Sequence, residues 1–288
     1  MNPEISEKQS DTYLAAAMLA PLAQASSGCS WPVTFLLSAL CLGAAQWLSC
    51  HALPQGKFLK LLQSLWTCVL GALVLRWASD YWPGHRENWA APLILLAMAA
   101  GIDKNRAIRV ACILLYPVLF LLGTIYLSAV PEMEPWQLIP RVRMTNMDIV
   151  PFLLLPALER GAGGRKPLWK LMLFAVAASA VSLLANTTKA PVYELSRNIS
   201  LFGTGWRFES LASVAMTLGF FTALSYLMAA GSGTGKTKWG KAVITALLYL
   251  WGIPYNSQAI AIGTVILFLI IPAVMTLQNF WRKKEKTS

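Results

Sequence analysis

Long apolar segments alternate with short polar ones along almost the whole chain. Segments close to the about 17–25 residues of one membrane crossing lie near 12–30, 31–51, 58–79, 89–102, 107–130, 144–158, 168–187, 208–230, 239–254 and 258–281. The pattern predicts an all-α, polytopic membrane protein with about ten transmembrane helices. We expect residues 1–288 to form a single membrane domain.

Composition supports the same class. Hydrophobic residues make up 56% of the 288 residues, charged residues make up 13%, and the mean hydropathy is +0.54. A soluble domain of this size is less apolar. Sixteen prolines and nineteen glycines are tolerated in membrane helices, where neighbouring groups satisfy the freed backbone. The five cysteines follow no metal-ligand spacing, and we interpret them as small apolar residues.

The distribution of basic residues predicts the topology. With both termini in the cytoplasm, cytoplasmic segments carry seventeen of the 24 Lys and Arg residues, including Lys236, Lys238 and Lys241 at the connection before 239–254. The opposite face receives Arg76, Arg86, Arg141, Arg143, Lys189, Arg197 and Arg207. This bias follows the positive-inside rule and predicts cytoplasmic N and C termini. It also accounts for the net charge of +11 without a nucleic-acid partner, so we expect a multi-pass membrane protein.

Helix breakers occur at corresponding places in two spans. Pro21 precedes a small polar run that ends at Gly28, and Pro151 and Pro156 follow Asp148 in 144–158. These spans open two successive sets of five, 12–130 and 144–281, and inverted-repeat transporters place ligand-binding broken helices at such positions. The alternative is that the prolines only kink their helices. For Asp148, the alternative is a position at the headgroup level rather than a functional one.

A glycine-rich run, AGSGTGKTK, matches the loose pattern of a phosphate-binding loop. That loop works where a strand precedes it and a helix follows it. Here the segment Gly231–Thr237 connects two apolar spans, 208–230 and 239–254. We therefore expect a flexible basic turn at the cytoplasmic face rather than nucleotide binding.

Other chemistry has no clear pattern in the sequence. His51 and His85 stand far apart, without neighbouring ligand residues, so we expect no metal site and no cofactor. We find no combination of nucleophile, base and orienting residue, and we expect neither catalytic residues nor an enzyme. Serines and threonines within the spans are expected to donate to backbone carbonyls of their own helices.

One polar segment, PVYELSRNISLFGTGWRFE, carries a family resemblance. Its Pro191, Tyr193, Glu194, Arg197, Ile199, Ser200, Arg207 and Glu209 resemble a motif of the B, or permease, subunit of bacterial spore germination receptors (GerAB-type). Similar passages are ISEKQ near the start, ALVLRWASDYW, GIDKNRAIRVACILLYPVLF and the closing IIPAVMTLQNFWRKK. The resemblance implies a ten-helix inverted repeat of the LeuT type, within the amino acid–polyamine–organocation transporter superfamily. It also implies a subunit that senses amino acids or nucleosides beside other receptor subunits in the inner spore membrane.

Three functions follow from this resemblance. The first is a subunit that senses a small solute through a transporter-like fold. Its expected ligand-binding residues are Ala23, Ser26, Gly28, Asn146, Asp148, Pro151, Glu194 and Arg197. For Glu194 and Arg197 the alternative is a local ion pair that fixes the outer loop. The second function is an active amino-acid permease, which needs a titratable or cation-binding group in its core. The third is an assembly subunit without a ligand site, which the shortened first helix favours.

Overall fold

The structure is a computed structural model of the full chain. It describes residues 31–51, 56–81, 89–103, most of 105–120, scattered positions between 172 and 183, and then 208–230, 235–252 and 257–285. Nearly all of these residues are helical. The prediction of an all-α protein is therefore confirmed for the part of the chain that the structure describes.

The helices follow the apolar segments closely. Their bounds are α2 Trp31–His51, α3 Lys57–Tyr81, α4 Ala90–Gly101, α9 Phe208–Ala229, α10 Gly235–Leu250, α11 Ser257–Val265, the π-helix η6 Ile266–Ile270, and α12 Ile271–Glu285. Further helical residues lie between 105 and 120 and between 172 and 183. The spans 12–30 and 144–158 lie outside the described residues, so the number of crossings stays a prediction.

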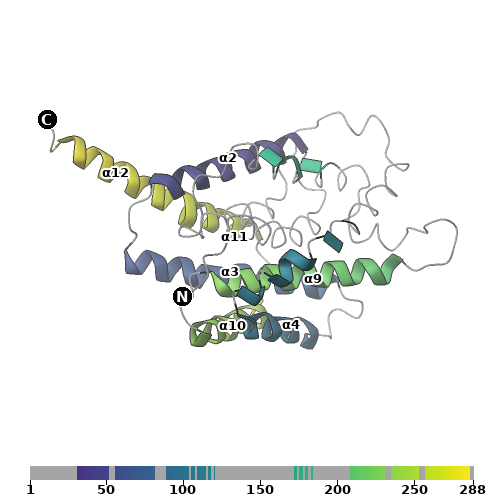
Figure 1. The fold of residues 1–288 in the computed structure, drawn as a ribbon. Coiled ribbons are helices and arrows are strands. Elements are labelled where there is room, and N and C mark those ends of the chain that lie inside the picture. The colour runs from purple at the N-terminus through teal and green to yellow at the C-terminus, as the bar shows by residue number, and fades with distance from the viewer. Residues whose placement is uncertain are drawn as a thin grey trace.

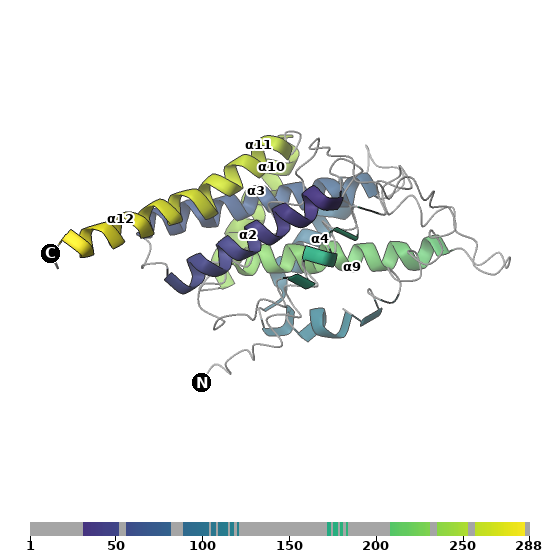
Figure 2. The same ribbon diagram turned by 90° about the horizontal axis from the view of Figure 1, so that it is seen from above.

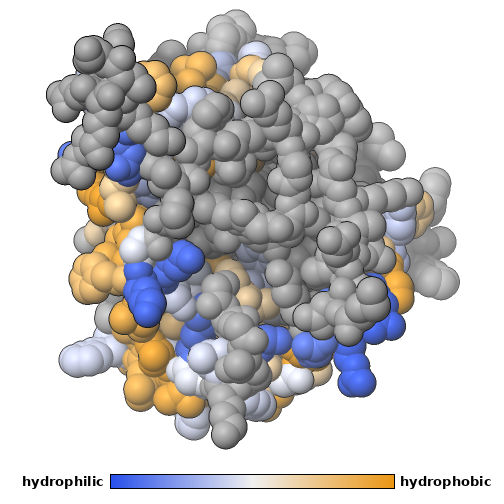
Figure 3. Space-filling view, turned by 60° about the vertical axis from the view of Figure 1, so that its left-hand side comes forward, coloured by the Kyte–Doolittle hydropathy of each residue, from blue (hydrophilic) through white to orange (hydrophobic). Residues whose placement is uncertain are grey.

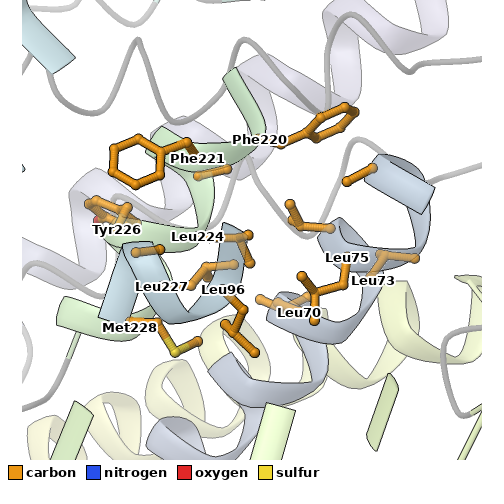
Figure 4. Packing of buried hydrophobic residues seen from close by; sticks show 14 of the residues in the cluster. Leu70, Leu73, Leu75, Leu96, Phe220, Phe221, Leu224, Tyr226, Leu227 and Met228 are labelled. Carbon is orange, nitrogen blue, oxygen red and sulfur yellow. The ribbon is translucent and has the colours of Figure 1, made fainter. Parts of the chain in front are cut away.

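Four helices, α3, α4, α9 and α10, pack around a common apolar core (Figure 1). Figure 4 shows leucines of α3 facing Leu96 of α4 and a row of α9 side chains from Phe220 to Met228. Leu70, Leu73, Phe220 and Tyr226 are almost completely buried. Close packing of such side chains stabilises contacts between membrane helices, so this core holds the four helices together.

A second group of helices lies along another side of α3. The continuous helix formed by α11, η6 and α12 contacts α3 through α11, and α2 packs against η6 and α12 (Figure 2). Beyond these contacts, α12 extends away from the rest of the described structure (Figures 1 and 2). The molecule thus has a four-helix cluster with a helix layer beside it.

A proline explains the π-helix. At its end the N–H of Ile271 bonds to the carbonyl of Ile266, five residues back. In the same register the next donor would be the nitrogen of Pro272, which carries no hydrogen. The carbonyl of Leu267 therefore lacks its helical partner, and the side-chain amide of Gln63 on α3 donates to it at 3.2 Å. Pro272 thus interrupts the helical hydrogen bonds and leaves the Leu267 carbonyl available for its contact with α3.

The outer faces of the helices are apolar. Large exposed side chains include Phe58 (77% exposed), Ile94 (60%), Val243 (57%) and Trp251 (83%), and apolar patches are visible at the surface in Figure 3. Two helical segments, Lys57–Ser79 and Gln258–Trp281, are long and apolar enough to cross a membrane by length and composition. Trp31–Ala44, Ala90–Gly101 and Met216–Ala229 are shorter apolar helices.

Buried hydroxyl groups behave as the sequence predicts. Ser38, Thr222, Ser225 and Thr264 each donate to a carbonyl three or four residues earlier in the same helix, at 2.6–2.8 Å. Each hydroxyl proton is thus satisfied within its own helix. Cys41 and Cys68 are free and buried, which confirms their interpretation as small apolar packing residues.

Candidate functional site

The predicted ligand-binding residues cannot be compared with the fold. Ala23, Ser26, Gly28, Asn146, Asp148, Pro151, Glu194 and Arg197 all lie outside the described residues. The predicted site therefore stays a prediction. The described helices instead contain a polar cluster that the sequence analysis did not identify.

Two lysines of α10 lie inside the four-helix cluster. Lys238 is 8% exposed and Lys241 is 7% exposed. The sequence analysis counted both among the cytoplasmic charges, and that topology stays a prediction. The structure shows that both side chains are buried between helices rather than exposed in a loop. Helix α10 begins at Gly235, four residues before the expected start, and a separation of three residues puts both side chains on one helical face.

The Lys241 ammonium joins α10 to two other helices. It donates to the hydroxyl oxygen of Thr67 on α3 at 3.0 Å and to the carbonyl of Ala230. Ala230 directly follows the last residue of α9, where helix carbonyls lack intrahelical donors. The Thr67 hydroxyl in turn donates to the carbonyl of Ser64 at 2.7 Å, so its orientation suits acceptance from the ammonium.

Lys238 makes an equivalent contact with another helix end. Its ammonium donates to the carbonyl of Ile102 at 3.1 Å. Ile102 is the residue after α4, where the backbone turns from helical to extended. One face of α10 therefore supplies two cations to the carboxy-terminal ends of two helices, α4 and α9.

Helix ends provide the electrostatic compensation for these cations. The carboxy-terminal end of a helix carries about half a negative charge, and it attracts an ammonium group that donates to its last carbonyls. Among the described side chains, no carboxylate is a hydrogen-bond or ion-pair partner of Lys241. The two ammonium groups therefore depend on backbone and hydroxyl oxygens in this part of the chain.

The Thr245 hydroxyl is an exception in this cluster. It is completely buried, and its oxygen has no hydrogen bond of acceptable geometry within the described structure. The side chain lies one turn after Lys241, beside the Cys68 thiol and against Gly71 of α3. A buried hydroxyl without a partner is costly.

Replacing Thr245 by valine is therefore expected to leave the free energy of unfolding unchanged or to raise it by up to about 1 kcal/mol, because the change keeps the shape and removes an unsatisfied hydroxyl. Thermal unfolding in detergent would measure this. Thr264→Val is the matched control, since that hydroxyl accepts from Trp66 and donates to Ile260, and stability should fall. Equal losses in the two variants would contradict the prediction.

A second polar contact joins α3 to the π-helix region. The Trp66 indole nitrogen donates to the hydroxyl oxygen of Thr264 at 2.9 Å, one turn from the contact between Gln63 and Leu267. The same indole ring lies against Gly263, where no side chain intervenes. Polar groups of α3 thus contact α10 through Thr67 and the α11–η6 segment through Trp66 and Gln63.

The phosphate-loop pattern lies between two helices, as expected. Helix α9 ends at Ala229, residues 231–234 lie outside the described part, and Gly235, Lys236 and Thr237 form the first turn of α10. The expected flexible turn is wrong for Gly235–Lys238, because these residues belong to α10. Helix α10 also ends earlier than expected, at Leu250 instead of residue 254. Two residues later, Gly252 adopts a φ of 77°, the left-handed conformation that commonly follows the end of a helix.

Two features of the sequence mark the residues involved, although neither identifies their partners. Lys238 and Lys241 are three residues apart at the start of an apolar span, so they share a face once the helix extends back to Gly235. Trp66 was the one tryptophan in the middle of a predicted span rather than near its end. A polar group in the middle of a span indicates an interhelical partner.

Comparisons with known proteins add no family to this picture. The chain matches no protein-family model and no curated protein.

Proposed function

We propose that the chain is a polytopic membrane subunit with an inverted-repeat transporter fold, and that it senses a small solute of the amino acid or nucleoside class. In this proposal it belongs to a bacterial germination receptor of the type that its sequence resembles. The solute contacts the two broken spans, 12–30 and 144–158. Other receptor subunits detect the resulting change of conformation.

The packing of four helices is the observation that carries the proposal. In the ten-span arrangement, α3 and α4 are the third and fourth spans of the first set, and α9 and α10 are their counterparts in the second. Among the contacts between the sets, α3 with α10 and α4 with α9 exchange when counterparts are exchanged. The other two, an equally extensive contact of α3 with α9 and a smaller one of α4 with α10, each map onto themselves. The slighter contacts, α3 with α4 and α9 with α10, exchange likewise. A pseudo-two-fold axis between inverted repeats produces this pattern.

The surface supports a membrane location for this fold. Exposed apolar side chains lie on the outward faces of α3, α4, α10 and α12, whereas the buried polar contacts lie between helices. A bilayer favours this distribution, since apolar side chains face lipid and polar groups find partners inside. The assignment to a germination receptor is supported by the segment from Pro191 to Glu209, which resembles a motif of that family.

Equilibrium binding to the purified chain in liposomes tests the proposal. A panel of labelled amino acids and nucleosides would be measured with and without Na⁺ and H⁺ gradients. We expect saturable binding of at least one solute without accumulation, and weaker binding in Asp148→Asn. Binding at wild-type strength in both Asp148→Asn and Arg197→Ala would contradict the predicted site. Absence of binding by correctly folded protein would favour the assembly role.

Buried Lys241 favours a second candidate, an active permease. Apart from Asp148, the predicted spans are nearly free of charge, which argues against coupling to protons. The structure adds a lysine that is 7% exposed at a junction of three helices. Burial favours the neutral form of a lysine and so brings its protonation change closer to neutral pH.

Uptake measurements separate this candidate from the sensor. A permease would accumulate solute when an H⁺ gradient is imposed, and Lys241→Met would abolish accumulation while leaving equilibrium binding in place. Gradient-driven uptake that persists in Lys241→Met would exclude Lys241 as the coupling group.

A further inference from the structure

The two buried lysines have a mechanical consequence for the helix cluster. Each connects the first turns of α10 to a helix end from which a chain segment continues, Ile102 after α4 and Ala230 after α9. Lys241 also connects this face to the middle of α3 through Thr67. Four helices therefore converge on two ammonium groups that belong to one face of one helix.

We propose that Lys238 and Lys241 form a clamp, which consists of these two side chains with Ile102, Thr67 and Ala230. The clamp holds the carboxy-terminal ends of α4 and α9 against α10 and α3. The end of α9 separates from α3 only when the Lys241 ammonium leaves Ala230. Lys238 and Lys241 are thus positioning residues that determine which conformations the cluster adopts.

The packing around Lys241 favours two distinct states of the junction of α3, α9 and α10, one closed and one open. Met228 and Thr245 lie so close to Gly71 that no wider side chain separates α3, α9 and α10 there. Thr67, Cys68 and Thr245 are all buried at this junction, and each residue is at most 1% exposed. An opening that admits water would expose several of these groups together, because packed interiors do not deform gradually.

Only the biological role of the clamp rests on the proposed function, since a sensing subunit has to move part of its helix bundle. Its structural content is independent of any solute. Cys68 provides the readout, because it follows Thr67 in the chain, lies beside Lys241, and is completely buried. A thiol reagent reaches it only when the junction of α3, α9 and α10 opens.

The test measures the rate at which N-ethylmaleimide modifies the full-length protein when Cys68 is its sole cysteine. We expect Lys241→Met to accelerate modification by about tenfold or more, because the lost charge-assisted hydrogen bonds favour local opening by that order. Lys241→Arg should retain a slower rate than Lys241→Met, since it keeps the cation. A second protein with Cys41 of α2 as its sole cysteine should show no change with Lys241→Met.

Three results would overturn the clamp. These are an unchanged rate at Cys68, equal acceleration at Cys68 and Cys41, or an Arg variant as fast as the Met variant. If Lys241→Met does not fold, Thr67→Val decides the question, because it removes one partner of the ammonium and keeps the shape. The measurement uses no solute, so failure of every solute to bind would overturn the proposed function and leave this result intact.

Discussion

Replacing Gly263 by alanine is expected to destabilise the protein strongly. A methyl group at this position of α11 would lie 2.4 and 2.6 Å from two ring carbons of Trp66, far inside normal contact distance. The indole is rigid and is held by its hydrogen bond to Thr264, so the ring or the helix has to move. Overpacking of this kind costs roughly 1–3 kcal/mol, and loss of the hydrogen bond adds about 1 kcal/mol. Thermal unfolding in detergent would show a lower midpoint.

A second substitution tests the cause of this loss. Trp66→Leu removes the ring that the new methyl group would meet, so the double variant should lose less stability than the two single changes predict together. Gly43→Ala on α2 is the matched control, because nothing lies within 4 Å of its added carbon. Replacing a helical glycine by alanine in open space should raise the free energy of unfolding by up to about 1 kcal/mol. Additive losses in the double variant would show that the contact with Trp66 is not the cause.

Replacing Gly71 by leucine should separate α3 from its partners in the four-helix cluster. The first side-chain carbon alone would lie 3.0 Å from a methyl carbon of Thr245 and 3.2 Å from the terminal methyl of Met228. A leucine adds three further carbons in a completely packed interior. We expect a loss of roughly 3 kcal/mol or more, at or beyond the upper range for overpacking, and a lower midpoint of thermal unfolding.

The control for Gly71 lies on α10. Gly240 is exposed and has nothing within 4 Å of an added carbon, so Gly240→Leu introduces the same residue without a steric conflict. Its stability should remain near that of the wild-type protein. If Gly71→Leu folds with wild-type stability, the close approach of α3, α9 and α10 at Gly71 does not occur in the protein.

The pattern of apolar residues was sufficient to predict most of the helices that the structure describes. The segment 31–51 became α2 with the same bounds, and 58–79, 89–102 and 208–230 differ from α3, α4 and α9 by at most two residues at either end. Membrane-type helices are predictable in this way because each satisfies its own backbone hydrogen bonds and differs from its loops in hydropathy. The ends of α10 were less predictable, since a glycine-rich run gives no hydropathy signal where its helix begins.

The lysine cluster could not be predicted, because it depends on which helices meet. A count of basic residues treats Lys238 and Lys241 like exposed Lys57 and Lys60. What distinguishes them is the position of two carbonyls, at Ile102 and Ala230, that come from distant parts of the chain. The positions of these residues along the sequence do not show that they lie close together in the fold.

The sequence by itself determined the helical class and the positions of most described helices, because hydropathy acts locally. The π-helix before Pro272 was not predicted and became visible only in the structure. The tertiary structure alone decided that Gly71 and Gly263 are points of close approach. It also decided that Trp66 binds Thr264 and that two loop-like lysines are interior residues. These features depend on distances between helices, and packing of separate segments sets those distances.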